Sequence, residues 1–426
     1  MIGVPEIEPP KPGRAYWTAY QAPEGDMRPI DPLAMDMYAQ RIGNILLPGV
    51  TGRTFRSRYM GMVCAGLRIT SEHESGRTST RIVEARRNAF LPFERGWALA
   101  VCHHANGQIK ERSEETGRAA LTAEFQGFRG ANHVLSYWRQ SRARDSWVIP
   151  SDYELLRGQS SQGGLGSYLV TLVSGGFIDP RTLSLREPGQ ALAEAFLGDQ
   201  RRQSRRLPSG DRASWRALSG LGAELDLRRN TAGERAILEQ QIFNPTTGSL
   251  APAMRGLTLA GTDDAETALT VLSKAKGQEL SSIAEYALKF DPFRGAALAC
   301  FGGLGRSMEA SGELPTADIP DDVESSVAQL RRSARTLCDA DTPEGVHEIR
   351  QLALRIEAAS GTLATIDQIL DWHRDRRAAW IVRDGSQFKL GRKGNFDLDT
   401  SFHGYTVPSF FSLLDDLRRP IAEDSH

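Results

Sequence analysis

Apolar and polar positions in residues 149–197 follow an order that predicts a winged helix-turn-helix module. Apolar residues recur at i, i+3, i+4 and i+7 from Leu165 to Leu172, which indicates one face of a helix. A shorter helix is expected before it, because Ser151 and Glu154 have the Ser-x-x-Glu spacing of a capping box. The pattern therefore begins with two consecutive helices.

Turn residues divide the second half of this segment. Gly175 and Gly176 are expected to end the second helix, where the chain needs a positive φ. Short apolar runs on both sides of the turn at residues 179–182 predict a two-stranded wing. Pro188 then opens a further helix, which Gly198 closes.

Helical spacing of apolar residues dominates the rest of the chain. Helices are expected near residues 35–46, 55–63, 82–104, 127–139, 322–337, 345–359, 362–377 and 410–417. Pro92 should kink or split the third of these helices. The stretch from Thr231 to Ser311 should be helical, with breaks at residues 244–245 and 291–292. Asp384-Gly385 lies between two short apolar runs and predicts a hairpin.

The predicted fold class is mainly α with small β-hairpins. We expect a multidomain helical protein containing one or two winged helix-turn-helix modules, since 426 residues allow two to four domains of roughly 150 residues. The expected parts are an extended arm at 1–31, a helical domain at 32–148, a winged-helix-like domain at 149–200, a helical domain at 201–312, a linker at 313–325, and a C-terminal helical and hairpin domain at 326–426. The last part is compatible with a second winged helix.

The charge of the chain gives no global attraction to nucleic acid, because the net charge is −1. Nearly all of the 52 cationic residues are arginine, however. Planar guanidinium groups suit phosphate and carboxylate recognition. A codon bias toward arginine explains the same excess, and this alternative weakens any inference drawn from the arginine clusters.

Two arginine clusters are the candidate nucleic-acid interface. The candidate residues are Arg53, Arg56, Arg58, Arg201, Arg202, Arg205 and Arg206. Binding through them would be dominated by backbone phosphates and would be sensitive to salt, although solvated surface faces are the alternative interpretation. The expected recognition helix, in contrast, has no Arg or Lys and should present Ser167, Thr171 and Ser174 to solvent.

Known catalytic and metal-binding patterns are missing from the sequence. There is no phosphate-binding P-loop, and the glycine-rich residues 163–166 lack its lysine. Cys102-His103-His104 points adjacent side chains about 100° apart on a helix, so these groups do not converge on one metal. His373 is expected to be a core histidine. We predict no catalytic residues, no metal site and no cofactor.

The cysteines and the hydropathy pattern indicate the compartment. The four cysteines are widely spaced and form no Cys-x-x-Cys pair, which favours reduced, buried thiols in a cytosol. The sequence has no apolar stretch of about 18 residues that could cross a membrane. We therefore expect a cytoplasmic protein without a membrane partner.

Two passages carry a resemblance to a known group of proteins. The first is residues 30–33 followed by residues 45–59, and the second is the glycine-rich turn at 127–130, which precedes a tryptophan-containing helix. Both resemble a poorly characterised bacterial family. Its genes are often found beside helicase and phospholipase-D-like nuclease genes in phage-defence islands. The resemblance covers about a third of the chain and contains no catalytic signature. It implies an accessory subunit of a multi-protein antiviral system.

The expected function is a non-catalytic adaptor or nucleic-acid-associated subunit of a bacterial antiviral defence complex. Its expected partners are other subunits of that complex, such as a helicase or a nuclease, together with a DNA or RNA backbone. A divergent nuclease or other enzyme with an unrecognised site is one alternative. A winged-helix transcriptional regulator is another, which the uncharged recognition helix disfavours.

Overall fold

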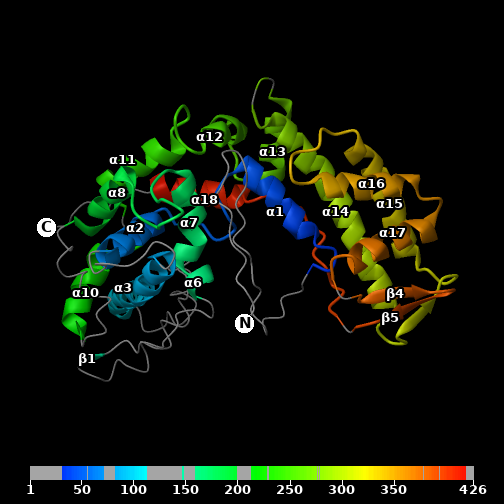
Figure 1. The fold of residues 1–426 in the computed structure, drawn as a ribbon, viewed down its shortest axis with the longest axis horizontal. Coiled ribbons are helices and arrows are strands. Elements are labelled where there is room, and N and C mark those ends of the chain that lie inside the picture. The colour runs from blue at the N-terminus through cyan, green and yellow to red at the C-terminus, as the bar shows by residue number, and fades with distance from the viewer. Residues whose placement is uncertain are drawn as a thin grey trace. The chain divides into compact units, whose positions relative to one another are not determined.

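The computed structural model describes residues 31–54, 56–71, 82–112, 146–147, 159–198, 213–227, 230–275, 277, 279–377, 379–392 and 394–418. The prediction of a mainly helical fold with small β-structure is confirmed in this part of the chain (Figure 1). The chain divides into two compact units. In the described part, unit 1 comprises Pro48–Ala251 and the residues from Ser409 onward, and unit 2 comprises the residues up to Leu47 and Pro252–Pro408.

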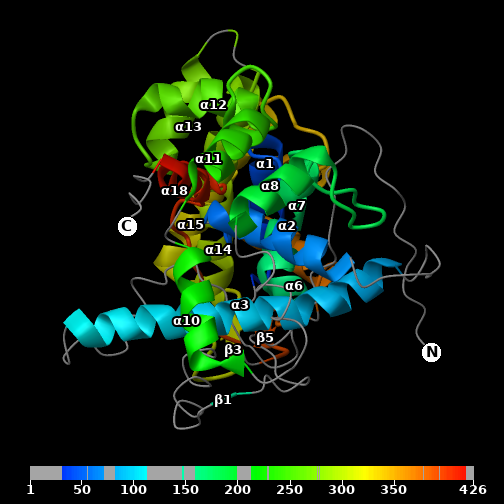
Figure 2. The ribbon, with the colours of Figure 1, turned by 90° about the vertical axis from the view of Figure 1, so that its left-hand side faces the viewer.

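Unit 1 is built on a long helix, α3 (Ile82–Arg112), which packs against α2 (Arg58–Ser71) and α10 (Trp215–Glu224), as Figure 2 shows. The other helices of unit 1 are α6 (Gln159–Gln162), α7 (Gly164–Ser174), α8 (Glu187–Leu197), α11 (Ala232–Leu238), the π-helix η4 (Glu239–Phe243) and most of α18 (Val407–Arg418). The short strands β1 (Ser146–Trp147) and β2 (Ala213–Ser214) pair antiparallel.

Aromatic side chains form the core of unit 1. The Tyr59 ring on α2 stacks on Tyr168 of α7 at 5.0 Å and meets the edge of Trp97 of α3 at 5.2 Å between ring centroids. A Cβ atom at Gly66 would lie 2.6 Å from ring atoms of Phe90 and of Phe93. Helices α2 and α3 can therefore approach this closely only because residue 66 has no side chain.

The prolines inside two helices do not split them. Helix α3 runs through Pro92, so of the predicted kink or split the split is wrong. Helix α14 (Ser281–Ser307) runs through Pro292, so the break expected at residues 291–292 is wrong. A proline inside a helix costs about 3 kcal/mol. Phe93 and Phe293, which directly follow the two prolines, are fully buried, and this packing offsets the local cost of proline. The break expected at residues 244–245 is present, where η4 ends.

Unit 2 combines a helical layer with a three-stranded sheet. Its helices are α1 (Met35–Leu46), α12 (Ala251–Leu257), the 3₁₀ helix η5 (Thr258–Ala260), α13 (Ala265–Lys274), α14, α15 (Asp321–Cys338), α16 (His347–Ala358) and α17 (Thr362–Arg374). The strands are β3 (Glu313–Pro315), β4 (Ile381–Asp384) and β5 (Gln387–Leu390), in the antiparallel order β3-β5-β4. Figure 1 shows β4 and β5 near α17.

The linker expected at residues 313–325 is a structured part of unit 2. Its first residues form β3, in which Leu314 pairs with Phe388, and its last residues begin α15 at Asp321. Prolines and acidic residues suggested a loop, but a proline at the end of an edge strand and acidic residues in the first turn of a helix are both favourable.

His373 is a core histidine, as its position on an apolar face predicts. The ring is fully buried, its Nε2 accepts the Trp380 N–H at 2.9 Å, and its Nδ1 lies 2.7 Å from the Pro32 carbonyl. The first contact makes Nε2 the acceptor, so Nδ1 carries the proton and donates it to Pro32. The ring thereby joins α17 to Trp380, which directly precedes β4, and to Pro32, which lies before α1.

The expected division into consecutive domains differs from the two units in the structure. Each unit takes segments from distant parts of the chain. Phe410 of α18 contacts Phe243 of η4 in unit 1, and the Trp372 indole of α17 donates to the Leu33 carbonyl at 2.8 Å in unit 2. Cores that are shared by distant segments leave no signal in the local pattern of the sequence.

The segment expected to be a winged helix contains two of its elements as predicted. Helix α7 ends at Gly175, and α8 contains Pro188 in its first turn and ends at Gly198. The wing is reduced to one antiparallel bridge between Ile178 and Leu185. The helix expected from Ser151 lies outside the described residues.

Candidate anion-binding pocket

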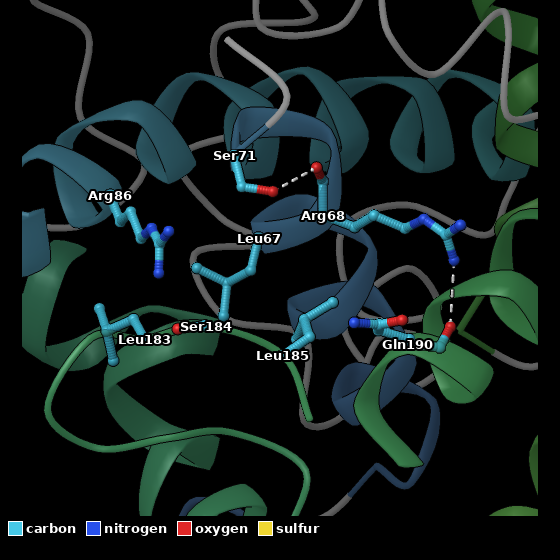
Figure 3. Close-up of a pocket in the computed structure, with 8 residues that line it drawn as sticks. All are labelled: Leu67, Arg68, Ser71, Arg86, Leu183, Ser184, Leu185 and Gln190. Atoms are coloured by element: carbon cyan, nitrogen blue, oxygen red, sulfur yellow. Dashed lines mark hydrogen bonds between the residues drawn. The ribbon is translucent and has the colours of Figure 1, made fainter. Parts of the chain in front are cut away.

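A pocket of about 310 Å³ lies in unit 1 between α2, α3, α8 and residues 177–186, which we call the hairpin loop. It is lined by Leu67, Arg68, Ser71, Arg86, Leu183, Ser184, Leu185 and Gln190 (Figure 3). None of these described residues carries a carboxylate, whereas two carry guanidinium groups. The composition favours a ligand that has an anionic group and an apolar part.

Backbone hydrogen bonds fix the shape of the hairpin loop. The Asp179 and Ser184 backbones are joined at 2.9 Å, and the Arg186 N–H donates to Phe177 at 2.8 Å. Leu183 has a φ of 57°, a left-handed conformation that costs a leucine about 1–2 kcal/mol. Its side chain is buried. Strained residues of this kind persist only where their surroundings hold them, which is common at ligand sites.

Arg86 connects α3 to the hairpin loop. Its Nη1 donates to the Thr182 carbonyl at 2.6 Å, next to the strained Leu183. The side chain is half-buried, and Figure 3 shows its guanidinium between α3 and the loop. The hydrogen bond therefore holds a positive group in a fixed place on the pocket wall.

Arg68 connects the last turn of α2 to α8. Its Nη2 lies 2.7 Å from the Glu194 Oε1, and its Nη1 donates to the Gln190 carbonyl at 3.2 Å. The Arg68 side chain is 18% exposed and the Glu194 side chain is 63% exposed. An ion pair with such an exposed partner contributes roughly 0–1 kcal/mol, so an anionic ligand can replace Glu194 at low cost.

The sequence-predicted arginines Arg56 and Arg58 lie in the core of unit 1 instead of on its surface. Arg56 Nη1 pairs with Asp416 at 2.8 Å, and Arg58 Nε lies 3.4 Å from Glu234. Arg58 also donates to the carbonyls of Asp226 and Glu224. Their exposed fractions are 7% and 1%, which corrects the interpretation of these two residues as contacts for a nucleic-acid backbone.

The remaining predicted arginines have different positions. Arg53 is half-buried in the loop before α2. Arg201, Arg202, Arg205 and Arg206 lie outside the described residues. The structure therefore places Arg56 and Arg58 in the buried core. The prediction for the tract of Arg201, Arg202, Arg205 and Arg206 stays a prediction.

The glycine-rich start of α7 already holds an anion from the chain itself. The Glu94 carboxylate accepts the Gly164 N–H at 2.5 Å and the Gln159 side-chain amide at 2.8 Å. A Cβ atom at Gly163 would lie 2.7 Å from the Glu94 Oε2. The glycines thus allow an internal carboxylate to approach the helix N-terminus, where its dipole favours negative charge.

Helix α7 is more deeply buried than a recognition helix should be. Ser167 and Thr171, which were expected to face solvent, are 4% and 1% exposed, and only Ser174 of the three is exposed. The Thr171 hydroxyl donates to the Gly49 carbonyl at 2.5 Å. The polar face of α7 is therefore used for packing within unit 1.

Metal-ligating and nucleophilic groups are scattered in the described part of the chain. No group of three or more His, Cys, Asp or Glu residues there could hold a metal ion. Burial, together with the neighbouring His104, lowers the pKa of His103. Burial also raises the pKa of the Cys64 thiol above its usual range and that of Cys300 to about 12, so both stay protonated.

Sequence reasoning missed both arginines of the pocket. Arg68 has no neighbouring arginine in the sequence, and the adjacent pair Arg86 and Arg87 was not singled out as a candidate. The strained Leu183 gave no signal either, because leucine does not predict a left-handed conformation. The hairpin loop that walls the pocket, in contrast, was recognised as a turn.

Comparisons with protein-family models, with curated proteins and with solved structures found no match to this chain. None of the helices in the described residues is long and apolar enough to cross a membrane.

Proposed function

We propose that this chain is a non-catalytic adaptor or nucleic-acid-associated subunit of a bacterial antiviral defence complex. The observation that carries the proposal is the two-arginine pocket beside the hairpin loop. Its guanidinium groups come from two helices and are held by carbonyl groups of the loop and of α8. Such a preformed site suits the binding of an anionic group. The defence context comes from the resemblance of the N-terminal passages.

We further propose that α7, the hairpin loop and α8 act as a winged-helix type of docking module. Winged helices that read DNA expose a polar or basic recognition helix in the major groove. Ser167 and Thr171 of α7 are buried, and the helix has no cation. These two facts favour docking of a partner over base recognition, and they disfavour the transcriptional regulator.

Backbone contacts with nucleic acid are assigned in this proposal to the tract of Arg201, Arg202, Arg205 and Arg206. Changing all four to glutamine should weaken binding to unrelated sequences equally and flatten its dependence on salt, because phosphate contacts carry no base information. A fluorescence anisotropy titration of the full chain over a range of salt concentrations measures both effects. Undiminished binding by this variant would remove the tract from the interface.

Co-purification tests the adaptor function itself. The tagged full chain is expressed with the products of its neighbouring genes and purified with and without nuclease treatment. We expect helicase or nuclease subunits to remain bound after nuclease treatment, because an adaptor holds them by protein contacts. Elution of the chain alone under both conditions would contradict the proposal. Magnesium-dependent cleavage of nucleic acid by the pure chain, abolished by one carboxylate substitution, would contradict its non-catalytic part.

A further inference from the structure

We propose that the pocket binds a single nucleotide carrying a terminal phosphate. This inference rests on the proposed function, because it names the ligand class of the same site. The volume of about 310 Å³ is at the lower end of the range of small-ligand pockets, roughly 300–1,000 Å³. A pocket of this size suits one nucleotide, whereas a duplex backbone requires an open surface.

The phosphate is assigned to the end of the pocket that carries Arg86, because Figure 3 shows the Arg68 guanidinium at the opposite end, directed away from Arg86 and toward α8. Guanidinium groups bind phosphate oxygens through two parallel N–H donors. Arg86 is already oriented by its bond to the Thr182 carbonyl at 2.6 Å. Arg68 is held at the other end by Glu194 and by the Gln190 carbonyl. The Ser71 hydroxyl donates to the Arg68 carbonyl, whereas the Ser184 hydroxyl, which is paired with Thr182, can offer a contact to a further phosphate or ribose oxygen.

The nucleoside is assigned to the apolar part of the pocket. Leu67, Leu183 and Leu185 supply aliphatic surface against which a base or ribose can lie. The Gln190 side chain lines the pocket from α8, and Figure 3 shows its amide directed toward Leu185. A side-chain amide has both donors and an acceptor and can pair with a base edge. This arrangement distinguishes a nucleotide from a bare inorganic anion.

Isothermal titration calorimetry of the full chain tests the inference. The probes are the four nucleoside 5′-monophosphates, with adenosine and inorganic phosphate as the two partial ligands and a short peptide that ends in a leucine carboxylate as the alternative ligand. We expect at least one nucleotide to bind, with each partial ligand weaker by about tenfold or more, since each lacks one half of the contacts. Arg86→Gln should weaken binding by about tenfold or more, because a hydrogen bond to a charged group is lost.

Two further variants keep the test independent of folding. Glu194→Gln alters an exposed side chain and should tighten nucleotide binding by up to about twofold, because it removes a negative charge beside the pocket. Arg186→Gln removes an exposed arginine that does not line the pocket and should leave the affinity unchanged. Thermal melting of each variant shows whether its fold is retained.

Four results would overturn the inference. They are absence of binding by every nucleotide, binding that neither Arg86→Gln nor Glu194→Gln alters, binding of inorganic phosphate as tight as that of the nucleotides, and tighter binding of a peptide that ends in a leucine carboxylate. If partner subunits still co-purify in any of these cases, the inference fails while the proposed adaptor function stands.

Discussion

The two ends of helix α2 use arginine in opposite ways. At its start, Arg58 is 1% exposed and shares a buried ion pair with Glu234, and the preceding Arg56 pairs with Asp416. In its last turn, Arg68 pairs with an exposed carboxylate beside a pocket. The first two guanidinium groups are part of the core of unit 1. The third can change partners, which is what a binding site requires.

The buried ion pair at the start of α2 gives the larger expected effect. Arg58→Ala should lower the free energy of unfolding by about 3–5 kcal/mol, because it leaves Glu234 buried without its partner. Guanidinium chloride denaturation followed by circular dichroism measures the change. The double variant Arg58→Met with Glu234→Gln should recover much of the loss, since it removes both charges at similar volume. A loss below about 1 kcal/mol for Arg58→Ala would show that the pair is not part of the core.

The pH dependence of that loss sharpens the comparison. Burial raises the pKa of Glu234, and the Arg58 guanidinium counteracts this rise. The pKa of Glu234 is higher in the folded protein than in the unfolded chain, where it is near 4.5. Protonated Glu234 therefore stabilises the folded state fully below pH 4.5, and this contribution is lost as the pH rises through the pKa of the folded state. Arg58→Ala should raise that pKa further, so its deficit should be smaller at pH 5 than at pH 8, while the loss of the hydrogen bonds to the Asp226 and Glu224 carbonyls remains at both. The difference should be about 1.4 kcal/mol for each pH unit by which the pKa rises.

This experiment has an internal control at the other end of the helix. Arg68→Gln should show the same small deficit at pH 5 and at pH 8, because Glu194 is exposed and solvent screens its pair with Arg68. Denaturation curves of both variants at the two pH values give the comparison. An Arg58→Ala deficit that is independent of pH would contradict the assignment to Glu234.

The exposed ion pair should give the smallest effect on stability. A double-mutant cycle with Arg68→Gln and Glu194→Gln should yield a coupling free energy of about 0.5 kcal/mol, because solvent screens this pair. Denaturation midpoints of the four proteins provide the measurement. A coupling of about 3 kcal/mol would make Arg68 a structural residue like Arg58, and the pocket would lose one of its binding groups.

Local patterns predicted the elements of unit 2 well. The helices α15, α16 and α17 and the hairpin of β4 and β5 lie close to the expected ranges. Their apolar periodicity and the Asp384-Gly385 turn are properties of neighbouring residues, which a sequence displays directly. The continuous helices across Pro92 and Pro292 could not be predicted in this way, because packing of distant residues outweighs the local cost of proline.

The candidate site depends on information that is distant in the sequence. Arg56 was interpreted as a surface residue, and its burial depends on Asp416, which is 360 positions away in the chain. The pocket is formed by α2, α3, the hairpin loop and α8, and each of them contributes at most three of its lining residues. Single arginines in different helices show no pattern until the fold places them together. The lack of Arg and Lys in the candidate recognition helix was the one sequence signal that any anion-binding site lies outside this helix.

Closure of unit 1 by α18 has a consequence for the chain as it is synthesised. At translation rates of about 5–20 residues per second, the 360 positions that separate Arg56 from Asp416 correspond to roughly 20–70 seconds. During that time Arg56, Ser57 and Asn230 have emerged from the ribosome without the carboxylate that joins them. The interface that awaits α18 therefore combines a charged, hydrated part with the apolar surface that Phe410 later covers, and unit 1 closes only when α18 with Asp416 arrives.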